Sequence, residues 1–153
     1  MTDSLSNEVW KRRIASWNYT RRFDIMLAAP FEDFEMTGLY GFDFIDETAD
    51  RLCSQGKRVF VPHREIRDDW PAEKVYDVSN GIVIPDSDLV IGYLGSPSTA
   101  IGIMLTHAAL CLKPIICFAP YDESLDKRLL LIAPEISKII GFKTKKECLD
   151  SLE

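Results

Sequence analysis

The sequence lacks paired cysteines, long hydrophobic runs and any excess of basic residues. Its four cysteines are scattered, with no CxxC spacing and no neighbouring histidine, which argues against a zinc knuckle or a redox pair. The most apolar run, Ala100–Leu112, is interrupted by Thr106 and His107 and is too short to span a bilayer. The first charged residues are not followed by the apolar segment of a signal peptide. We therefore expect a cytoplasmic protein with free thiols and with no metal or other cofactor.

The charge balance also excludes several kinds of partner. The chain has 24 acidic and 18 basic residues and a net charge of −6. This balance disfavours broad contact with a nucleic-acid backbone or with an anionic membrane. We therefore expect a small-molecule ligand rather than a nucleic acid or a membrane, and an anionic ligand would require a local set of donors.

Length and composition indicate one globular domain. The 153 residues are 46% hydrophobic and 27% charged, which is near the average for folded domains. We expect a single domain over residues 1–153, in which residues 1–20 form a helical extension. A helix predicted over Asn7–Asn18 places Trp10, Ile14 and Trp17 on one face. That face is expected to dock on the body of the protein or on a second subunit.

Apolar segments of strand length alternate with segments of helical periodicity along the rest of the chain. Because the apolar strands do not alternate with polar residues, we expect burial on both faces. This pattern predicts an α/β fold of the Rossmann-like or flavodoxin-like kind, with a mainly parallel five-stranded sheet and helices on both faces. The predicted strands are Phe23–Ala28, Lys57–Pro62, Leu89–Leu94, Pro114–Ala119 and Lys138–Phe142, and the predicted helices are Phe42–Gln55, Pro71–Val83 (weakened by Gly81), Ser98–Leu112, Ser124–Leu131 and a last helix opening at Thr144.

Ligands of open α/β sheets bind at the carboxyl ends of the strands. After the first strand, Ala28 and Ala29 would let a ligand approach the backbone, and Phe31 would stack on a base. A surface loop whose aromatic side chains fold back on the core is the alternative. After the second strand, Arg64 would pair with a phosphate and His63 would bind substrate or transfer protons. An exposed charged loop is the alternative for these two residues.

The segment after the third strand predicts a phosphate site. Free backbone N–H groups and the helix dipole favour an anion at a helix start, and nearby hydroxyl groups add donors. Helix capping alone is the alternative for the same residues. Gly102, inside the helix, costs up to about 1 kcal/mol relative to Ala, which indicates close approach of a ligand or another helix. The residues of the predicted phosphate site are Gly95, Ser96, Ser98 and Thr99.

The stretch from Asp88 to Phe118, DLVIGYLGSPSTAIGIMLTHAALCLKPIICF, resembles the signature of the nucleoside 2-deoxyribosyltransferase family. It looks closest to the branch that hydrolyses deoxynucleoside 5′-monophosphates. The shared pattern is an aspartate opening a hydrophobic strand, a Pro-Ser turn, a glycine, a helix and a Lys-Pro before the next strand. FDIMLAAPF also resembles the first strand and turn of the family, so the likeness covers residues 23–119. The resemblance implies a nucleotide pocket with Ser98 at the 5′-phosphate, the first loop at the base, and a homodimer or larger assembly.

The resemblance also implies chemistry that this chain does not carry at the matching positions. In the family, a glutamate attacks the anomeric carbon, or helps water to attack it, while oxocarbenium-like charge develops. That position is Met104 in this chain, and the position of a family aspartate is Asn80. A thioether has no negative charge and no general-base capacity.

Two functions therefore remain open. In the first, the protein is an N-glycosidase or deoxyribosyltransferase whose carboxylate has moved, with Asp77 one helical turn before Asn80 as the catalytic candidate. Glu32, Asp33 and Glu35 in the first loop are the other candidates. In the second, the pocket binds a nucleoside or nucleotide without cleaving it, as a sensor or as a subunit of a complex. A different small-molecule activity on the same fold also stays open.

Overall fold

The apolar strand segments of the chain form one parallel sheet, which the computed structural model describes over residues 2–28, 42–93, 99–120 and 138–142, with 146, 150 and 151. The strand order is β2-β1-β3-β4-β5, and each neighbouring pair is parallel. The predicted parallel α/β architecture is confirmed. The strands are β1 (Ile25–Ala28), β2 (Val59–Phe60), β3 (Leu89–Tyr93), β4 (Ile115–Pro120) and β5 (Lys138–Phe142).

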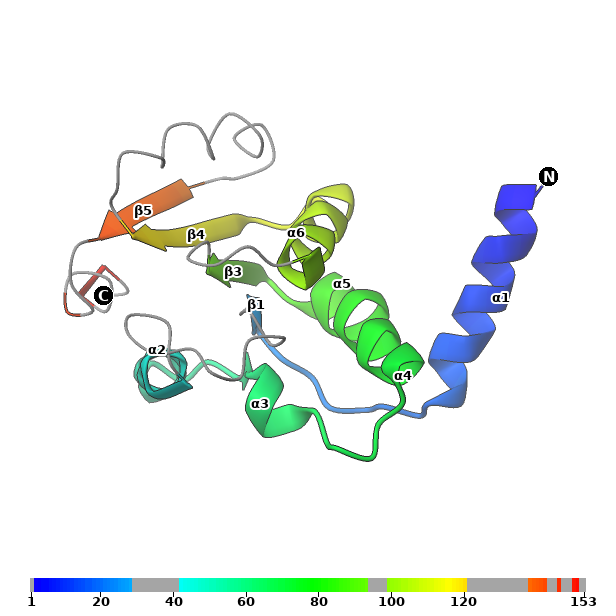
Figure 1. Ribbon diagram of the computed structural model, residues 1–153, viewed down its shortest axis with the longest axis horizontal. Coiled ribbons are helices and arrows are strands. Elements are labelled where there is room, and N and C mark those ends of the chain that lie inside the picture. Colours follow the sequence, from blue (N-terminus) through cyan, green and yellow to red (C-terminus); the bar gives the residue numbers. More distant parts are fainter. Residues whose placement is uncertain are drawn as a thin grey trace.

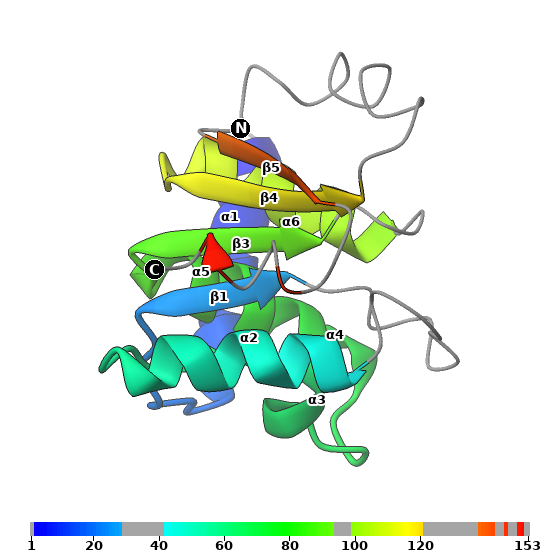
Figure 2. The same ribbon diagram turned by 90° about the vertical axis from the view of Figure 1, so that its left-hand side faces the viewer.

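Both faces of the sheet are covered by helices, as the unbroken apolar strands predict. Leu27 of β1 shares a buried cluster with Ile45 of α2 (Phe42–Ser54) on one face. The next residue along the chain is Ala28, and it shares a second cluster with Leu105 of α6 (Thr99–Leu110) on the opposite face. Figure 2 shows α2 across the near face of the sheet, with α5 and α1 behind it.

The second strand is shorter than predicted. The strand expected over Lys57–Pro62 contains only Val59 and Phe60, and the helix α3 (Pro62–Glu65) follows almost at once. Pro62 stands in the first turn of α3, where its fixed φ favours a helix and its missing N–H costs nothing. Proline thus ends the strand by opening a helix.

The helix predicted over Pro71–Val83 is longer and less regular than expected. It consists of α4 (Ala72–Tyr76), the seven-residue π-helix η1 (Asp77–Val83) and α5 (Ile84–Asp86) in direct succession. Gly81 does not interrupt it. Ser87 Oγ donates a hydrogen bond to Val83 O at 2.6 Å, which satisfies a carbonyl near the helix end. The helix predicted over Ser124–Leu131 lies outside the described residues, as does most of the helix predicted after Thr144.

The N-terminal helix α1 (Thr2–Ser16) forms a separate outer layer. It begins earlier than the predicted Asn7, and Figure 1 shows it beyond α4 and α5, on the side away from the sheet. Its predicted apolar face is the one that contacts η1. An ideal Cβ at Gly81 would lie 2.5 Å from Ile14 Cδ1 and 3.3 Å from the Trp10 ring, so α1 lies directly on the backbone of η1 at this glycine.

The variant Gly81→Ala is expected to destabilise the protein by about 1–3 kcal/mol, because its methyl group overlaps Ile14. The variant Ile14→Ala removes the overlapping atoms, so the two changes should couple in a double-mutant cycle. Urea unfolding of the two single variants and the double variant measures this coupling. Additive effects would contradict the packing of Ile14 over Gly81.

Candidate functional site

The strand order predicts a ligand crevice between β1 and β3. In a doubly wound sheet, connections from these neighbouring strands leave in opposite directions, and ligands bind at the carboxyl ends of the strands at that point. Ala28, at the end of β1, is fully buried and pairs with Gly92 of β3. Two small residues therefore stand side by side under the crevice. The predicted binding residues Ala29, Phe31, Gly95, Ser96 and Ser98 lie outside the described residues.

The start of α6 lies at the same edge of the sheet. The helix begins at Thr99, after the segment that follows β3, and the first N–H groups of a helix have no partner within the helix itself. Figure 2 shows the start of α6 on the side to which the strand arrows point. The backbone of Thr99 thus stands where a phosphate site was predicted. Gly102 lies one turn further on, with open space where its Cβ would be.

The two positions that the resemblance assigns to carboxylates hold buried neutral side chains. Met104 is 7% exposed and belongs to the apolar cluster that also contains Val83 and Leu105. Asn80 is 3% exposed and lies in η1, which packs against α6. Its Nδ2 donates a hydrogen bond to Tyr76 O at 3.2 Å. Its Oδ1 is buried and has no hydrogen-bond partner in the described part of the chain.

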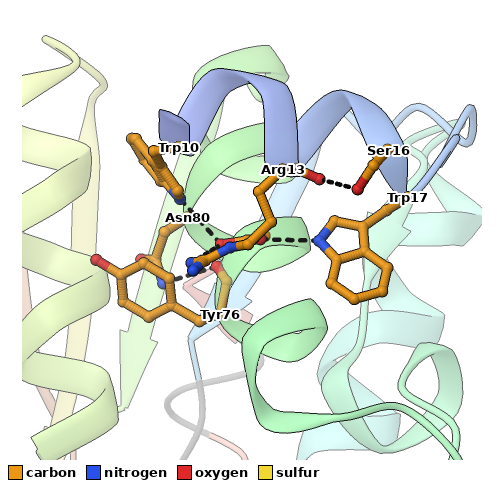
Figure 3. A network of polar contacts seen from close by, with 7 residues as sticks. Trp10, Arg13, Ser16, Trp17, Tyr76 and Asn80 are labelled. Atoms are coloured by element: carbon orange, nitrogen blue, oxygen red, sulfur yellow. Dashed lines mark hydrogen bonds and ion pairs between the residues drawn. The ribbon is translucent and has the colours of Figure 1, made fainter. Parts of the chain in front are cut away.

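Asp77, the predicted relocated carboxylate, accepts hydrogen bonds from α1 and from Trp17, the residue directly after it. Figure 3 shows the side chains of the donors Trp10, Arg13 and Trp17 turned towards one another. The guanidinium of Arg13 binds the Asp77 carboxylate in a bidentate fashion, with Nε 2.7 Å from Oδ2 and Nη2 2.8 Å from Oδ1. The indole N–H of Trp10 donates to Oδ1 at 2.9 Å, and that of Trp17 donates to Oδ2 at 2.8 Å. Asp77 is fully buried, whereas the Arg13 side chain is 44% exposed.

These four hydrogen bonds fix the charge state of Asp77. The guanidinium of Arg13 and then the two indole donors, working against desolvation, lower the pKa of Asp77 to about 2. The carboxylate is therefore ionised, but its oxygens already carry four donors. Its geometry under α1 gives no support to the predicted catalytic role, which stays a prediction.

A second polar cluster lies at the carboxyl end of β2. His63 Nε2 is 2.8 Å from Asp46 Oδ1 of α2, and Arg64 Nε donates to the same oxygen at 2.7 Å. Arg64 Nη2 also donates to Asp50 at 3.1 Å. His63 and Arg64 therefore belong to a short helix that is paired with α2, rather than to an unpaired loop. The guanidinium of Arg64 is already engaged by two carboxylates.

Sequence reasoning missed the partners of both polar clusters. Arg13 escaped notice because a charged residue on an amphipathic helix is normally assigned to solvent. The available signal was the spacing of Trp10, Arg13 and Trp17, which places three N–H donors within two helical turns. Asp46 and Asp50 share one face of α2 at the spacing i, i+4, which indicated a face that needs cations. Among the described residues, no group of three or more His, Cys, Asp or Glu side chains is arranged to hold a metal ion, and no helix is long and apolar enough to cross a membrane.

Comparison with known proteins identifies relatives of the fold. No protein-family model matches the chain, and no curated protein matches it significantly. Among solved structures, it is similar to a CMP N-glycosidase of Clostridium botulinum, with a TM-score of 0.64 and 20% identity over 84% of this chain and 95% of that one. It is also similar to a 2-deoxyribosyltransferase of Bacillus psychrosaccharolyticus, with a TM-score of 0.58 and 20% identity over 82% of this chain and 90% of that one. At this identity, the likeness establishes the fold.

Acidification is expected to release α1. Because the pKa of Asp77 is about 2, below its ordinary value of 3.8, its contribution to stability is fully present above pH 3.8 and is lost as the pH falls towards 2. Tryptophan emission should shift to the red over this interval as Trp10 and Trp17 become exposed. Asp77→Asn should remove the transition, whereas Asp24→Asn, which removes another carboxylate whose pKa is about 2, should preserve it. A full transition in Asp77→Asn would refute the assignment.

Proposed function

We propose that this protein binds a nucleoside or nucleotide in the crevice between β1 and β3. The start of α6 would hold the 5′-phosphate, and the loop after β1 would lie at the base. Three observations support this proposal: the strand order, the helix start at Thr99, and the fold shared with two proteins whose names describe CMP and deoxyribosyl chemistry.

We further propose that binding occurs without cleavage of the N-glycosidic bond. The observation that carries this proposal is the buried Met104 at the position where the resembling family has its catalytic glutamate. Cleavage needs an anion beside the anomeric carbon as positive charge develops there, and a thioether supplies none. The nearby carboxylate of Asp77 is turned to α1 and holds four donors.

The loss of carboxylates also alters the electrostatics of the proposed pocket. A glutamate and an aspartate would repel a bound phosphate, and within about 4 Å such repulsion reaches several kcal/mol near a protein surface. Met104 and Asn80 remove both sources of repulsion. The exchange therefore favours retention of an intact nucleotide, as a sensor or as a subunit of a complex. Cleavage by Glu32, Asp33 or Glu35 of the first loop is the alternative.

We propose that the protein acts as a homodimer built on α6. Between Thr99 and Leu112 the sequence contains no Asp, Glu, Lys or Arg, although 27% of the chain is charged. One face of α6 is exposed to solvent, and a groove of about 540 Å³ runs along it. The open space above Gly102 would let a second helix approach closely. The groove is lined by Tyr76, Gly102, Ile103, Thr106, His107 and Leu110.

Binding and cleavage can be separated in one experiment. The protein is incubated with a panel of nucleosides, their 5′-monophosphates and NAD, followed by thermal shift and by chromatography for free base. We expect a 5′-monophosphate to stabilise the protein, by about 2.7 kcal/mol at 100 times its Kd, with no release of base. Ser98→Asp should abolish this stabilisation for phosphorylated ligands, because it places like charge at the helix start.

Two further variants complete the design. The double variant Met104→Glu, Asn80→Asp should gain base release if the pocket holds the nucleotide as proposed, and Met104→Gln is the uncharged control. Base release by the wild-type protein would contradict the proposal. Its abolition by Asp77→Asn, or by Glu32→Gln, Asp33→Asn or Glu35→Gln, would then identify the carboxylate.

The assembly is tested by size-exclusion chromatography with light scattering. We expect twice the chain mass of 17.4 kDa for the wild-type protein and the single-chain mass for Ile103→Glu, because the charge would be buried at the interface. Val9→Glu is the matched control, since Val9 is an exposed aliphatic residue of α1 outside the groove. A wild-type species of 17.4 kDa would refute the dimer.

A further inference from the structure

The π-helix η1 is an unusual element in the helical layer beside the sheet. The N–H of Ile84, directly after η1, reaches back five residues to Ser79 O, whereas an α-helix would reach back four. π-Turns are rare, and they occur frequently at functional sites. A run of seven residues in this form therefore requires contacts that hold it.

On its outer side, η1 is held by α1. Asp77, the first residue of η1, receives four hydrogen bonds from Trp10 and Arg13 of α1 and from Trp17 directly after it. Four residues later, the bare backbone of Gly81 lies under Ile14. The N-terminal segment therefore contacts η1 at two points about one turn apart, Asp77 and Gly81. Lys74 of α4 adds a cation–π contact, with its Nζ 5.8 Å from the centre of the Trp17 ring.

Between these two points lies Asn80. Its Nδ2 is committed to the backbone carbonyl of Tyr76, within the same helical segment. Its Oδ1 is a buried acceptor without a partner in the described part of the chain. Such an atom carries a desolvation cost that a ligand hydroxyl or N–H would relieve. The direction in which this oxygen points depends on the twist of η1, because π and α turns advance the helix by different angles per residue.

We infer that Asp77 is a positioning residue. By binding α1, it keeps this helix packed on η1. Together they maintain the π-helical twist that aims the Asn80 amide at the proposed nucleotide pocket. The inference deepens the proposed function and, in its binding part, rests on it. The inference also explains why the ion pair between Asp77 and Arg13 lies under α1, because a carboxylate that holds an outer helix does not need to contact the substrate.

The charges around Asp77 explain why the attachment of α1 to η1 depends on Arg13. Asp77 is fully buried, so its charge must be compensated, and Arg13 is the one cation that bonds to it within the described residues. The hydrogen bonds to Asp77, and to a smaller extent the negative charge of Glu73, raise the pKa of Arg13 above its ordinary value. Loss of Arg13 leaves a buried anion with indole donors only, which disfavours the docked state of α1.

The test compares Arg13→Gln with Arg12→Gln in the full chain. The two variants lose the same charge from adjacent residues of α1, but only Arg13 contacts Asp77. Hydrogen–deuterium exchange of residues 77–84 reports on η1, and calorimetry with CMP, UMP, AMP and GMP reports on the pocket. Arg13→Gln should accelerate exchange in residues 77–84 and weaken nucleotide binding, each by about tenfold or more, the size expected for loss of hydrogen bonds to a charged group. Arg12→Gln should change neither.

Two additions keep the outcome decisive. Trp17→Phe removes one donor to Asp77 and should give the same changes at smaller amplitude, should Arg13→Gln fail to fold. Faster exchange in residues 2–16 with unchanged exchange in residues 77–84 would overturn the inference, because α1 would then leave without altering η1. Unchanged nucleotide affinity despite a loosened η1 would overturn the positioning role of Asp77. A wild-type protein that binds no nucleotide of the panel would overturn the proposed function, and the exchange data alone would then decide whether α1 holds η1.

Discussion

The attachment of α1 depends on one buried carboxylate. The carboxylate of Asp77 accepts hydrogen bonds from a bidentate guanidinium and one indole N–H of α1 and from the indole N–H of Trp17 directly after it. Such a charge is costly to bury unless every lone pair is satisfied. The outer helix, the bare backbone at Gly81 and the π-helical segment between them therefore form one connected unit. The ion pair and the packing of Ile14 on Gly81 both hold this unit together.

The sheet could be predicted from sequence because its strands are apolar runs bounded by turns, and β5 was found at its predicted bounds. Local chemistry explains the errors: Pro62 opened a helix where a strand was expected, and the helix after Ala72 continued past Val83 to Asp86. The partners of Asp77 could not be predicted, since Arg13 lies 64 residues away in the chain. No periodicity of the sequence predicts a π-helix.

The proposed nucleotide pocket has neutral side chains at the two positions where the resembling family has carboxylates. Met104 and Asn80 could be identified from the motif alone, and the structure adds that both are buried beside packed helices. The resembling proteins share the fold over more than four-fifths of this chain at 20% identity. Because one fold can carry different chemistry, function has to be argued from the site.

The long sequence separation between α1 and η1, on which it packs, has a consequence during synthesis. The carboxylate of Asp77 is made 64 residues after Arg13, and β3, which flanks β1, follows later still. Until then two tryptophans have no partner and remain available to chaperones or to other nascent chains. α1 can therefore dock only after η1 has been made. A change that weakens its docking would lower the folding yield before it alters the finished protein.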